Sequence, residues 1–260
     1  MKIACYETNL TDAQWALLQP HLPTRSKRGR PPTDRRLVID AILYIVKGGI
    51  PWRLLPSGFP PWKTVHSIFR KGTRDRTWEN LNERLRALAR KQQDKRSRPT
   101  GAILDSQSVK SDAHGGLVGY EAAKKIKGRK RHLLVDTLGW VLGVAVTAAN
   151  VPEREGAQGL LSRVLGWFTW LRRMWVDGGY SGPAFADWVK TLRPKLEVEV
   201  VKRSDDVSGF KVLPKRWVVE RTFGWLMRHR RLVRDYEHCE TSAEAWVYIA
   251  MLRIQLRRLA

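Results

Sequence analysis

Apolar residues recur with a helical period over the first third of the chain. Between residues 33 and 49 they stand at i, i+3, i+4 and i+7, which predicts an amphipathic helix ending at a pair of glycines. Residues 11–14 fit a capping box, so a shorter helix is expected to begin there. Two basic helices are expected at residues 62–76 and 77–90. The pattern therefore predicts an all-helical domain over residues 1–95.

The pattern changes after a charged linker at residues 91–100. Short apolar runs of strand length then alternate with helical segments, and Asp136 is expected to accept hydrogen bonds in a hairpin turn. The expected strands cover residues 102–110, 132–149 (as a hairpin), 172–179 and 197–202, and the expected helices cover residues 155–171, 182–192, 216–237 and 242–259. This order predicts an α/β domain with a mixed sheet over residues 96–260.

Charge narrows the class of partner. The 260 residues include 48 Lys and Arg against 25 Asp and Glu, which gives a formal net charge of +23. Such an excess favours a polyanionic partner, because each neutralised phosphate releases counterions. Of the 12 tryptophans, some are expected in the core and others are free to stack on bases. The apolar fraction of 43% excludes wholesale disorder.

Secreted, membrane-spanning and zinc-binding proteins are disfavoured. The two cysteines match no disulfide-framework spacing, which favours a reducing cytoplasm. No signal-peptide pattern opens the chain and no apolar run approaches ~18 residues, so neither secretion nor membrane insertion is expected. The histidines form no HxxH or HxxxH pair, which argues against a zinc site.

Three carboxylates stand at positions suited to a metal site. Asp105 lies in an expected strand, Asp177 follows another and precedes two glycines, and Glu220 lies on the helix after the last strand. Side chains at strand ends converge in α/β sheets, and Mg²⁺ prefers carboxylate oxygens. Taken singly, each has a simpler interpretation, which is a turn or cap residue for either aspartate and a salt bridge for Glu220.

Several motifs together resemble one known family. They are LDSQSV around Asp105, GYEAAKKIKGRKRHLLVDTLGWVLG, VDGGYSG around Asp177 and RWVVERTFGWL around Glu220. With LTDAQWALLQPHLP near the start, these blocks cover nearly the whole chain in order. They are similar to DDE transposases of the insertion-sequence-five family, in the insertion-sequence-four-like superfamily. The resemblance implies an RNase H-like mixed sheet flanked by helices, preceded by the all-helical domain.

The resemblance also implies a site and a reaction. Asp105, Asp177 and Glu220 would be the catalytic triad and the ligands of two Mg²⁺ ions, for which Mn²⁺ can substitute. The enzyme would bind the terminal inverted repeats of an insertion sequence in double-stranded DNA. It would cut a phosphodiester by hydrolysis and join the freed 3′-hydroxyl to target DNA. A homodimer on DNA is the natural expectation, because two element ends must be paired, and the bacterial cytoplasm, at the nucleoid, is the expected location.

Two alternatives to a transposase stay open. One is a structure-specific nuclease on the same RNase H-like core, which would cut branched DNA and form no joined product. The other is a transposase-derived DNA-binding protein without catalysis, which would bind DNA but no divalent cation.

The presumed catalytic helix departs from the signature of the wider group, which is Tyr, two residues, Arg, three residues, Glu, six residues and Lys. Arg216 and Glu220 fit this signature. Leu213 stands in place of the Tyr, and Met227 stands in place of the Lys with Arg228 beside it. We therefore expect Arg216 and Arg228 to grip phosphates.

Further DNA contacts are expected from basic segments. The helix at residues 62–76 fits a helix-turn-helix-like module, and the run at residues 124–131 leads into a strand, although a solvated charged face is the simpler interpretation of each. The expected contacts are Lys63, Arg70, Lys71, Lys124, Lys125, Lys127, Arg129, Lys130 and Arg221. Trp217 and Trp225 are candidates for stacking on an unpaired base, although packing in the core is the simpler role of both.

Overall fold

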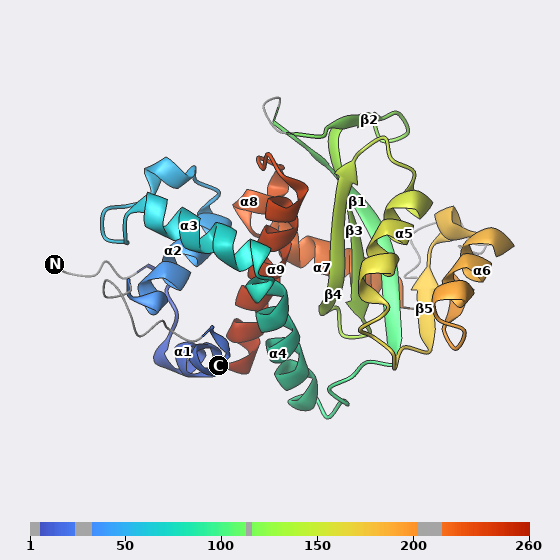
Figure 1. The fold of residues 1–260 in the computed structure, drawn as a ribbon, viewed down its shortest axis with the longest axis horizontal. Helices are drawn as coiled ribbons and strands as arrows, with labels where there is room; N and C mark the ends of the chain where they lie inside the picture. The colour runs from blue at the N-terminus through green and yellow to red at the C-terminus, as the bar shows by residue number, and fades with distance from the viewer. Residues whose placement is uncertain (1–5, 24–32, 113–115, 202–214) are drawn as a thin grey trace. The chain divides into compact units, whose positions relative to one another are not determined.

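The computed structural model describes residues 6–23, 33–112, 116–201 and 215–260, which divide into two compact units (Figure 1). The helical unit comprises Met1–Lys95, Leu226–Arg234 and Thr241–Ala260. The sheet unit comprises Arg96–Trp225 and Asp235–Glu240. After Trp225 the chain therefore alternates between the two units.

The helical unit follows the capping and stop signals of its sequence. Its helices are α1 (Asp12–Leu18), α2 (Arg35–Gly48), α3 (Trp62–Arg74), α4 (Thr77–Lys91), α8 (Arg230–Val233) and α9 (Glu240–Leu259), with 3-10 turns η1 (Gln19–His21) and η2 (Trp52–Leu54). The expected capping box is present, because Gln14 N donates to Thr11 Oγ1 at 3.2 Å and Thr11 N donates to Gln14 Oε1 at 3.3 Å. Gly49 ends α2 at a φ of 73°, a left-handed conformation that favours glycine. The predicted N-terminal helices are confirmed.

The C-terminal helix α9 lies in the core of the helical unit. Every residue from Ala243 to Arg253 is buried, so the helix has no exposed side over this length. The ring of Trp246 stacks on Phe69 at 4.5 Å and lies 5.5 Å from Trp52. A helix buried on all sides needs neighbours around its whole circumference. The sequence analysis predicts one domain over residues 96–260, whereas Leu226–Arg234 and Thr241–Ala260 group with the N-terminal helices in the structure.

The sheet unit is a mixed sheet. Its strands are β1 (Gly101–Lys110), β2 (Gly119–Glu121), β3 (Ile126–Asp136), β4 (Val141–Ala148), β5 (Arg173–Val176) and β6 (Glu197–Val200). The order is β2-β3-β1-β5-β6, with β4 also paired to β3. β3 runs antiparallel to β1, β2 and β4, whereas β5 runs parallel to β1 and to β6. This is the RNase H-like α/β arrangement that the sequence resemblance implied.

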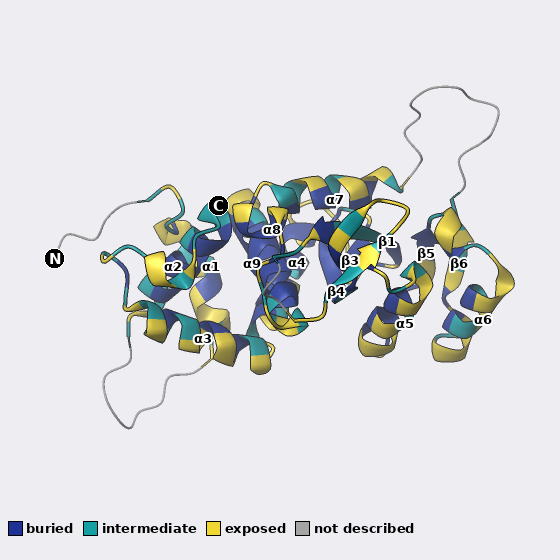
Figure 2. Ribbon diagram, turned by 90° about the horizontal axis from the view of Figure 1, so that it is seen from above, coloured by how far each residue is buried: buried dark blue, intermediate teal, exposed yellow. Residues whose placement is uncertain are grey.

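Helices cover both faces of this sheet (Figures 1 and 2). α5 (Glu153–Val164) and α6 (Pro183–Leu192) pack on one face, where Leu104 and Leu134 of the strands join Leu160 of α5 and Phe185 of α6 in one core. The first part of α7 (Trp217–Met227) lies on the opposite face, and Thr222 Oγ1 donates to Gly139 O at 2.9 Å. Covered faces explain why β4 and the Leu133–Val135 part of β3 are apolar runs rather than alternating ones.

The β3–β4 hairpin turn is held by Asp136, as expected. Its Oδ1 accepts hydrogen bonds from Leu138 N and Trp140 N, each at 2.9 Å. Its carboxylate is buried, so these backbone donors satisfy a charge that water does not reach. The structural role predicted for Asp136 is confirmed.

Two elements differ from the sequence-based expectation. β3 begins at Ile126 instead of residue 132, so most of the basic run lies inside a strand. The single helix expected over residues 216–237 is instead α7 and α8, which are separated by an extended residue, His229, with φ −102° and ψ 111°. After α8 the chain extends again, and Asp235 forms a parallel bridge with Ser111 at the end of β1. The backbone pairing of Asp235 with Ser111 takes this part of the chain out of the helix that its periodic pattern predicts.

No helix in the described part of the chain is both long enough and apolar enough to cross a membrane.

Candidate active site

The sheet brings Asp105 and Asp177 together. β1 and β5 are parallel neighbours, and Ile103 of β1 is in register with Trp175 of β5. Asp105 lies two residues after Ile103, and Asp177 lies two residues after Trp175. The carboxyl ends of parallel strands meet at one edge of a sheet, which is where α/β proteins place their ligands. The predicted meeting of these two carboxylates therefore follows from the strand register.

Asp105 is an acid whose charge is poorly tolerated. Burial raises the pKa of its carboxyl, the hydrogen bond from Ser106 N (2.7 Å) lowers it, and the nearby charges of Asp177 and Glu153 raise it. Arg216 acts in the opposite sense, and the resulting pKa is about 7. A cation placed beside such a carboxyl stabilises its charged form.

Asp177 is fixed by its position after β5. It is the N-cap of the 3-10 turn η3 (Gly178–Tyr180), and its Oδ1 accepts a hydrogen bond from Gly179 N at 2.9 Å. This contact engages one carboxylate oxygen and orients the group at the edge of the sheet. Asp177 is thus both a cap residue, its simpler interpretation, and a neighbour of Asp105.

Glu220 lies on α7 and is the most open of the three acids. Its Oε1 lies 3.4 Å from Arg216 Nη2, one helical turn away, and its side chain is 56% exposed. Arg216 is also the cation that acts on Asp105, so it links the helix to the aspartates. Within the described ranges, no three His, Cys, Asp or Glu side chains are preassembled as a metal site. The structure therefore pairs the two aspartates, while Glu220 is connected to them through Arg216.

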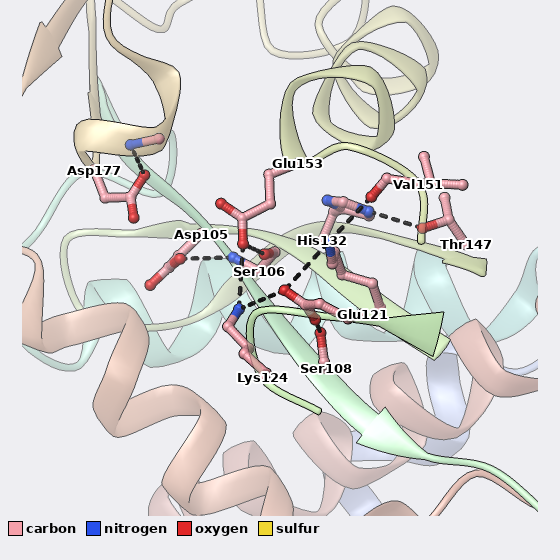
Figure 3. A network of polar contacts seen from close by, with 12 residues as sticks. Asp105, Ser106, Ser108, Glu121, Lys124, His132, Thr147, Val151, Glu153 and Asp177 are labelled. Carbon is pink, nitrogen blue, oxygen red and sulfur yellow. Dashed lines mark hydrogen bonds and ion pairs between the residues drawn. The ribbon is translucent and has the colours of Figure 1, made fainter. Parts of the chain in front are cut away.

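Glu153 is a residue of this region that the sequence reasoning missed. Its Oε1 accepts a hydrogen bond from Ser106 Oγ at 2.9 Å and lies 3.3 Å from Lys124 Nζ (Figure 3). The apolar pattern predicts the helix at this position only from residue 155, so Glu153 falls outside the predicted helix. Pro152 followed by an acid is a common helix start, and this signal could have located Glu153 in the first turn of α5.

The basic run is split between surface and interior. Lys124, Lys125 and Lys127 are exposed, and Lys124 also lies 3.4 Å from Glu121 Oε1. In contrast, the side chain of Arg129 is fully buried. Its Nε donates to Leu117 O and its Nη2 donates to His238 O, each at 2.9 Å.

Lys130 is buried as well, and its Nζ donates to Val151 O at 3.0 Å. The expectation that Arg129 and Lys130 contact DNA is therefore corrected, because their charged groups are occupied inside the protein.

Arg221 and its two tryptophans form a stack along α7. The guanidinium carbon of Arg221 lies 4.4 Å from the ring centre of Trp217 and 4.4 Å from that of Trp225. Arg221 Nη2 also donates to Leu138 O at 2.9 Å. Trp225 packs against Trp140 with ring centres 6.1 Å apart, whereas Trp217 is 40% exposed. Of the stacking candidates, Trp217 is thus the more open, and Arg221 is engaged in packing.

The remaining basic candidates lie in the helical unit. Lys63, Arg70 and Lys71 are exposed along α3, where Arg70 and Lys71 line a hollow with His66 and Arg74. Figure 2 shows this helix exposed along its outer side.

Arg228 is exposed too, and its carbonyl accepts a hydrogen bond from Lys47 Nζ at 3.0 Å. Arg228 belongs to the helical unit, whereas Arg216 belongs to the sheet unit. Leu213, which stands in place of the signature Tyr, lies outside the described residues.

Comparisons with known proteins agree with this arrangement. Residues 96–254 match the family "Transposase DDE domain", and residues 10–82 match the family "Putative transposase of IS4/5 family". An insertion element IS402 protein of 16.2 kDa from Burkholderia cepacia is 32% identical over 42% of this chain and 78% of its own length. The protein y4sN of Sinorhizobium fredii is 31% identical over 46% of this chain and 86% of its own length. No solved structure matches the chain. The chain belongs to the IS4/5 family of DDE transposases.

Proposed function

We propose that this transposase binds the terminal inverted repeats of an insertion sequence and performs divalent-cation-dependent cleavage and strand transfer with Asp105, Asp177 and Glu220. The observation that carries the proposal is the proximity of Asp105, within β1, to Asp177, which directly follows the parallel strand β5. Burial and the neighbouring acids raise the pKa of Asp105 to about 7, so Ser106 N and Arg216 compensate its charged form only in part.

The donor set suits Mg²⁺, or Mn²⁺ as a substitute. Hard cations prefer carboxylate oxygens, and the two aspartates offer them at one sheet edge. Glu220 would complete the set by turning from Arg216 towards the aspartates, since its exposed side chain is free to change rotamer. Two bound cations would supply charge stabilisation to the attacking and leaving oxygens of an in-line phosphoryl transfer.

The protein's own side chains would hold the DNA strand in place. Arg216 stands between Glu220 and Asp105 and can donate to a phosphate oxygen once Glu220 turns away. Hydrolysis would break the bond between phosphorus and the 3′-oxygen at the element end and release a 3′-hydroxyl. That hydroxyl would then attack a target phosphodiester, so one bond forms as another breaks and no covalent enzyme intermediate is needed.

Exposed cations supply the affinity for duplex DNA. Lys63, Arg70 and Lys71 on α3 form one candidate surface, and Lys124, Lys125 and Lys127 form another on the sheet unit. Arg216 and Arg228 would add phosphate contacts, and Trp217 would stack on an unpaired base. We further propose that two copies act together, because two inverted repeats must be paired for transfer.

The test uses the full chain and a duplex that carries the inverted repeats flanking its reading frame. We expect Asp105→Asn, Asp177→Asn and Glu220→Gln each to remove Mg²⁺-dependent cleavage while band-shift assays show unchanged DNA binding. Retained cleavage in any of the three variants would remove that residue from the proposed triad.

The products separate the proposal from its alternatives. A joined product with target DNA supports transposition, whereas cleavage of branched DNA without joining supports a structure-specific nuclease. DNA binding without any cation-dependent cleavage would identify a non-catalytic DNA-binding protein.

A further inference from the structure

Glu153 has one oxygen anchored from two sides. Ser106 Oγ donates to Oε1 at 2.9 Å, and Lys124 Nζ lies 3.3 Å from the same oxygen (Figure 3). The side chain is 26% exposed, which leaves the carboxylate in an environment with limited water. These contacts reduce the freedom of the glutamate before any ligand arrives.

The other oxygen of Glu153 faces Asp177 across Gly179. A β-carbon placed on Gly179 would lie 2.9 Å from Glu153 Oε2 and 3.1 Å from Asp177 Oδ1. The two carboxylates therefore both lie close to one point beside Gly179. Both polar contacts of Glu153 with described residues use Oε1, so Oε2 is the oxygen presented towards the aspartates.

We propose that Glu153 is a fourth acid of the active site, a positioning residue whose anchored carboxylate adds its charge beside Asp105 and Asp177 and strengthens divalent-cation binding there. This inference rests on the proposed function, because it takes the two aspartates as cation ligands. Carboxylates held close together repel one another, and a divalent cation between them relieves that repulsion.

A simpler role for Glu153 would be to hold Lys124. Glu121 serves that role equally well, since its Oε1 lies 3.4 Å from Lys124 Nζ and 3.7 Å from Lys130 Nζ. Glu121 also accepts a hydrogen bond from Ser108. It is absent from the charges that act on Asp105, whereas Glu153 is among them. Glu121 is therefore a matched control for the effect of losing a lysine partner.

The first experiment measures Mn²⁺ affinity of the full chain by isothermal titration calorimetry. We expect Glu153→Gln to weaken binding roughly tenfold, in the range found when groups behind metal ligands are removed. Glu121→Gln should leave the affinity within about twofold of the wild type, because it removes a charge from Lys124 but not from the acids. Thermal melts establish that each variant is folded.

A second pair of variants keeps every charge in place. In Gly179→Ala the new β-carbon would lie 2.9 Å from Glu153 Oε2, at the end of a side chain that can move aside at little cost to folding, and 3.1 Å from Asp177 Oδ1. We expect it to weaken Mn²⁺ binding by about the same factor as Glu153→Gln, because the anchored carboxylate is displaced. Gly178→Ala is the control, since a β-carbon there would meet nothing within 4 Å.

The outcomes separate this inference from the proposed function. If the wild type binds Mn²⁺ and Glu153→Gln binds it equally well, the fourth acid is refuted and the proposed triad stands. Equal losses in Glu153→Gln and Glu121→Gln would also refute it, in favour of a role through Lys124. If the wild type binds no Mn²⁺, both the proposed cation chemistry and the role of Glu153 are overturned.

Discussion

Two clusters of charged side chains differ in how their charges are balanced. One surrounds Asp105 of β1, and the other surrounds Arg129 of β3. At the far end of β1, Arg129 lies 3.6 Å from Asp235 and 3.9 Å from Glu240, with Arg129 and Asp235 almost fully buried. At the sheet edge, Asp105 is instead surrounded by the like charges of Asp177 and Glu153, with Arg216 as an opposing cation.

The same sheet therefore carries buried charge in two different arrangements. Arg129 also donates from Nε to Leu117 O and from Nη2 to His238 O, so the cluster ties residues 235–240 to the sheet. The acid group is compensated only in part, by Arg216 beside Asp105 and by Lys124 beside Glu153, and this costs stability; under the proposed function, a bound cation would relieve the repulsion. We therefore interpret the balanced charge in this sheet as structural, and we propose the functional role for the unbalanced charge.

Removing the arginine should convert the balanced cluster into an unbalanced one. We expect Arg129→Met to lower the free energy of unfolding by about 3–5 kcal/mol, because Asp235 would remain buried without its partner. Urea unfolding followed by circular dichroism measures this change. Lys127→Met is the control on the same strand, and it should shift stability by less than about 0.5 kcal/mol because Lys127 is exposed. Similar effects of the two substitutions would show that the buried Arg129–Asp235 pair does not stabilise the fold.

Neutralising Asp105 should raise the free energy of unfolding, whereas removing Arg129 should lower it. Its folded-state pKa is raised from 3.8 to about 7, so the stability it contributes is present below pH 3.8 and is lost as pH rises to about 7. We expect Asp105→Asn to be more stable than the wild type by about 2–4 kcal/mol at pH 7.5, and equal to it near pH 3.8.

Urea unfolding at several pH values, with a chelator present, measures this difference. A gap between Asp105→Asn and the wild type that does not change with pH would show that the acid group carries no uncompensated charge.

The positions of strands and helices could be predicted from the sequence better than the residues that they pack against. Apolar patterns located α2 and β1, and the convergence of strand ends in α/β sheets predicted that Asp105 and Asp177 lie together. The parallel pairing of β1 with β5 that brings them together could be seen only in the structure. The basic composition of residues 124–131 could not reveal that Arg129 is buried, because its partner Asp235 lies far along the chain. For the same reason, periodicity could not assign α9 to the helical unit, since its neighbours there come from the first hundred residues.

Gly128 marks the boundary between the exposed and buried parts of the basic run. A β-carbon there would lie 1.9 Å from Val109 O, a backbone atom of the neighbouring strand β1 that has little freedom to move. We expect Gly128→Ala to lower the free energy of unfolding by about 1–3 kcal/mol, as overpacking does in other interiors. Gly166→Ala is the matched control, because a β-carbon at Gly166 would meet nothing within 4 Å. Unchanged unfolding of Gly128→Ala would show that β1 and β3 are not in close contact there.

The smallest effect should come from the exposed lysines, and it should appear in DNA binding rather than in stability. Lys127→Gln is expected to reduce the slope of log affinity against log salt by about one unit, because one phosphate contact releases its counterion. Lys130→Gln should leave that slope unchanged but destabilise the fold, since its Nζ is buried against Val151 O. Fluorescence anisotropy with a duplex at several salt concentrations measures both slopes. A larger loss of slope for Lys130 than for Lys127 would mean that the buried end of the run opens when DNA binds, and the division between structural and DNA-facing cations would then fail.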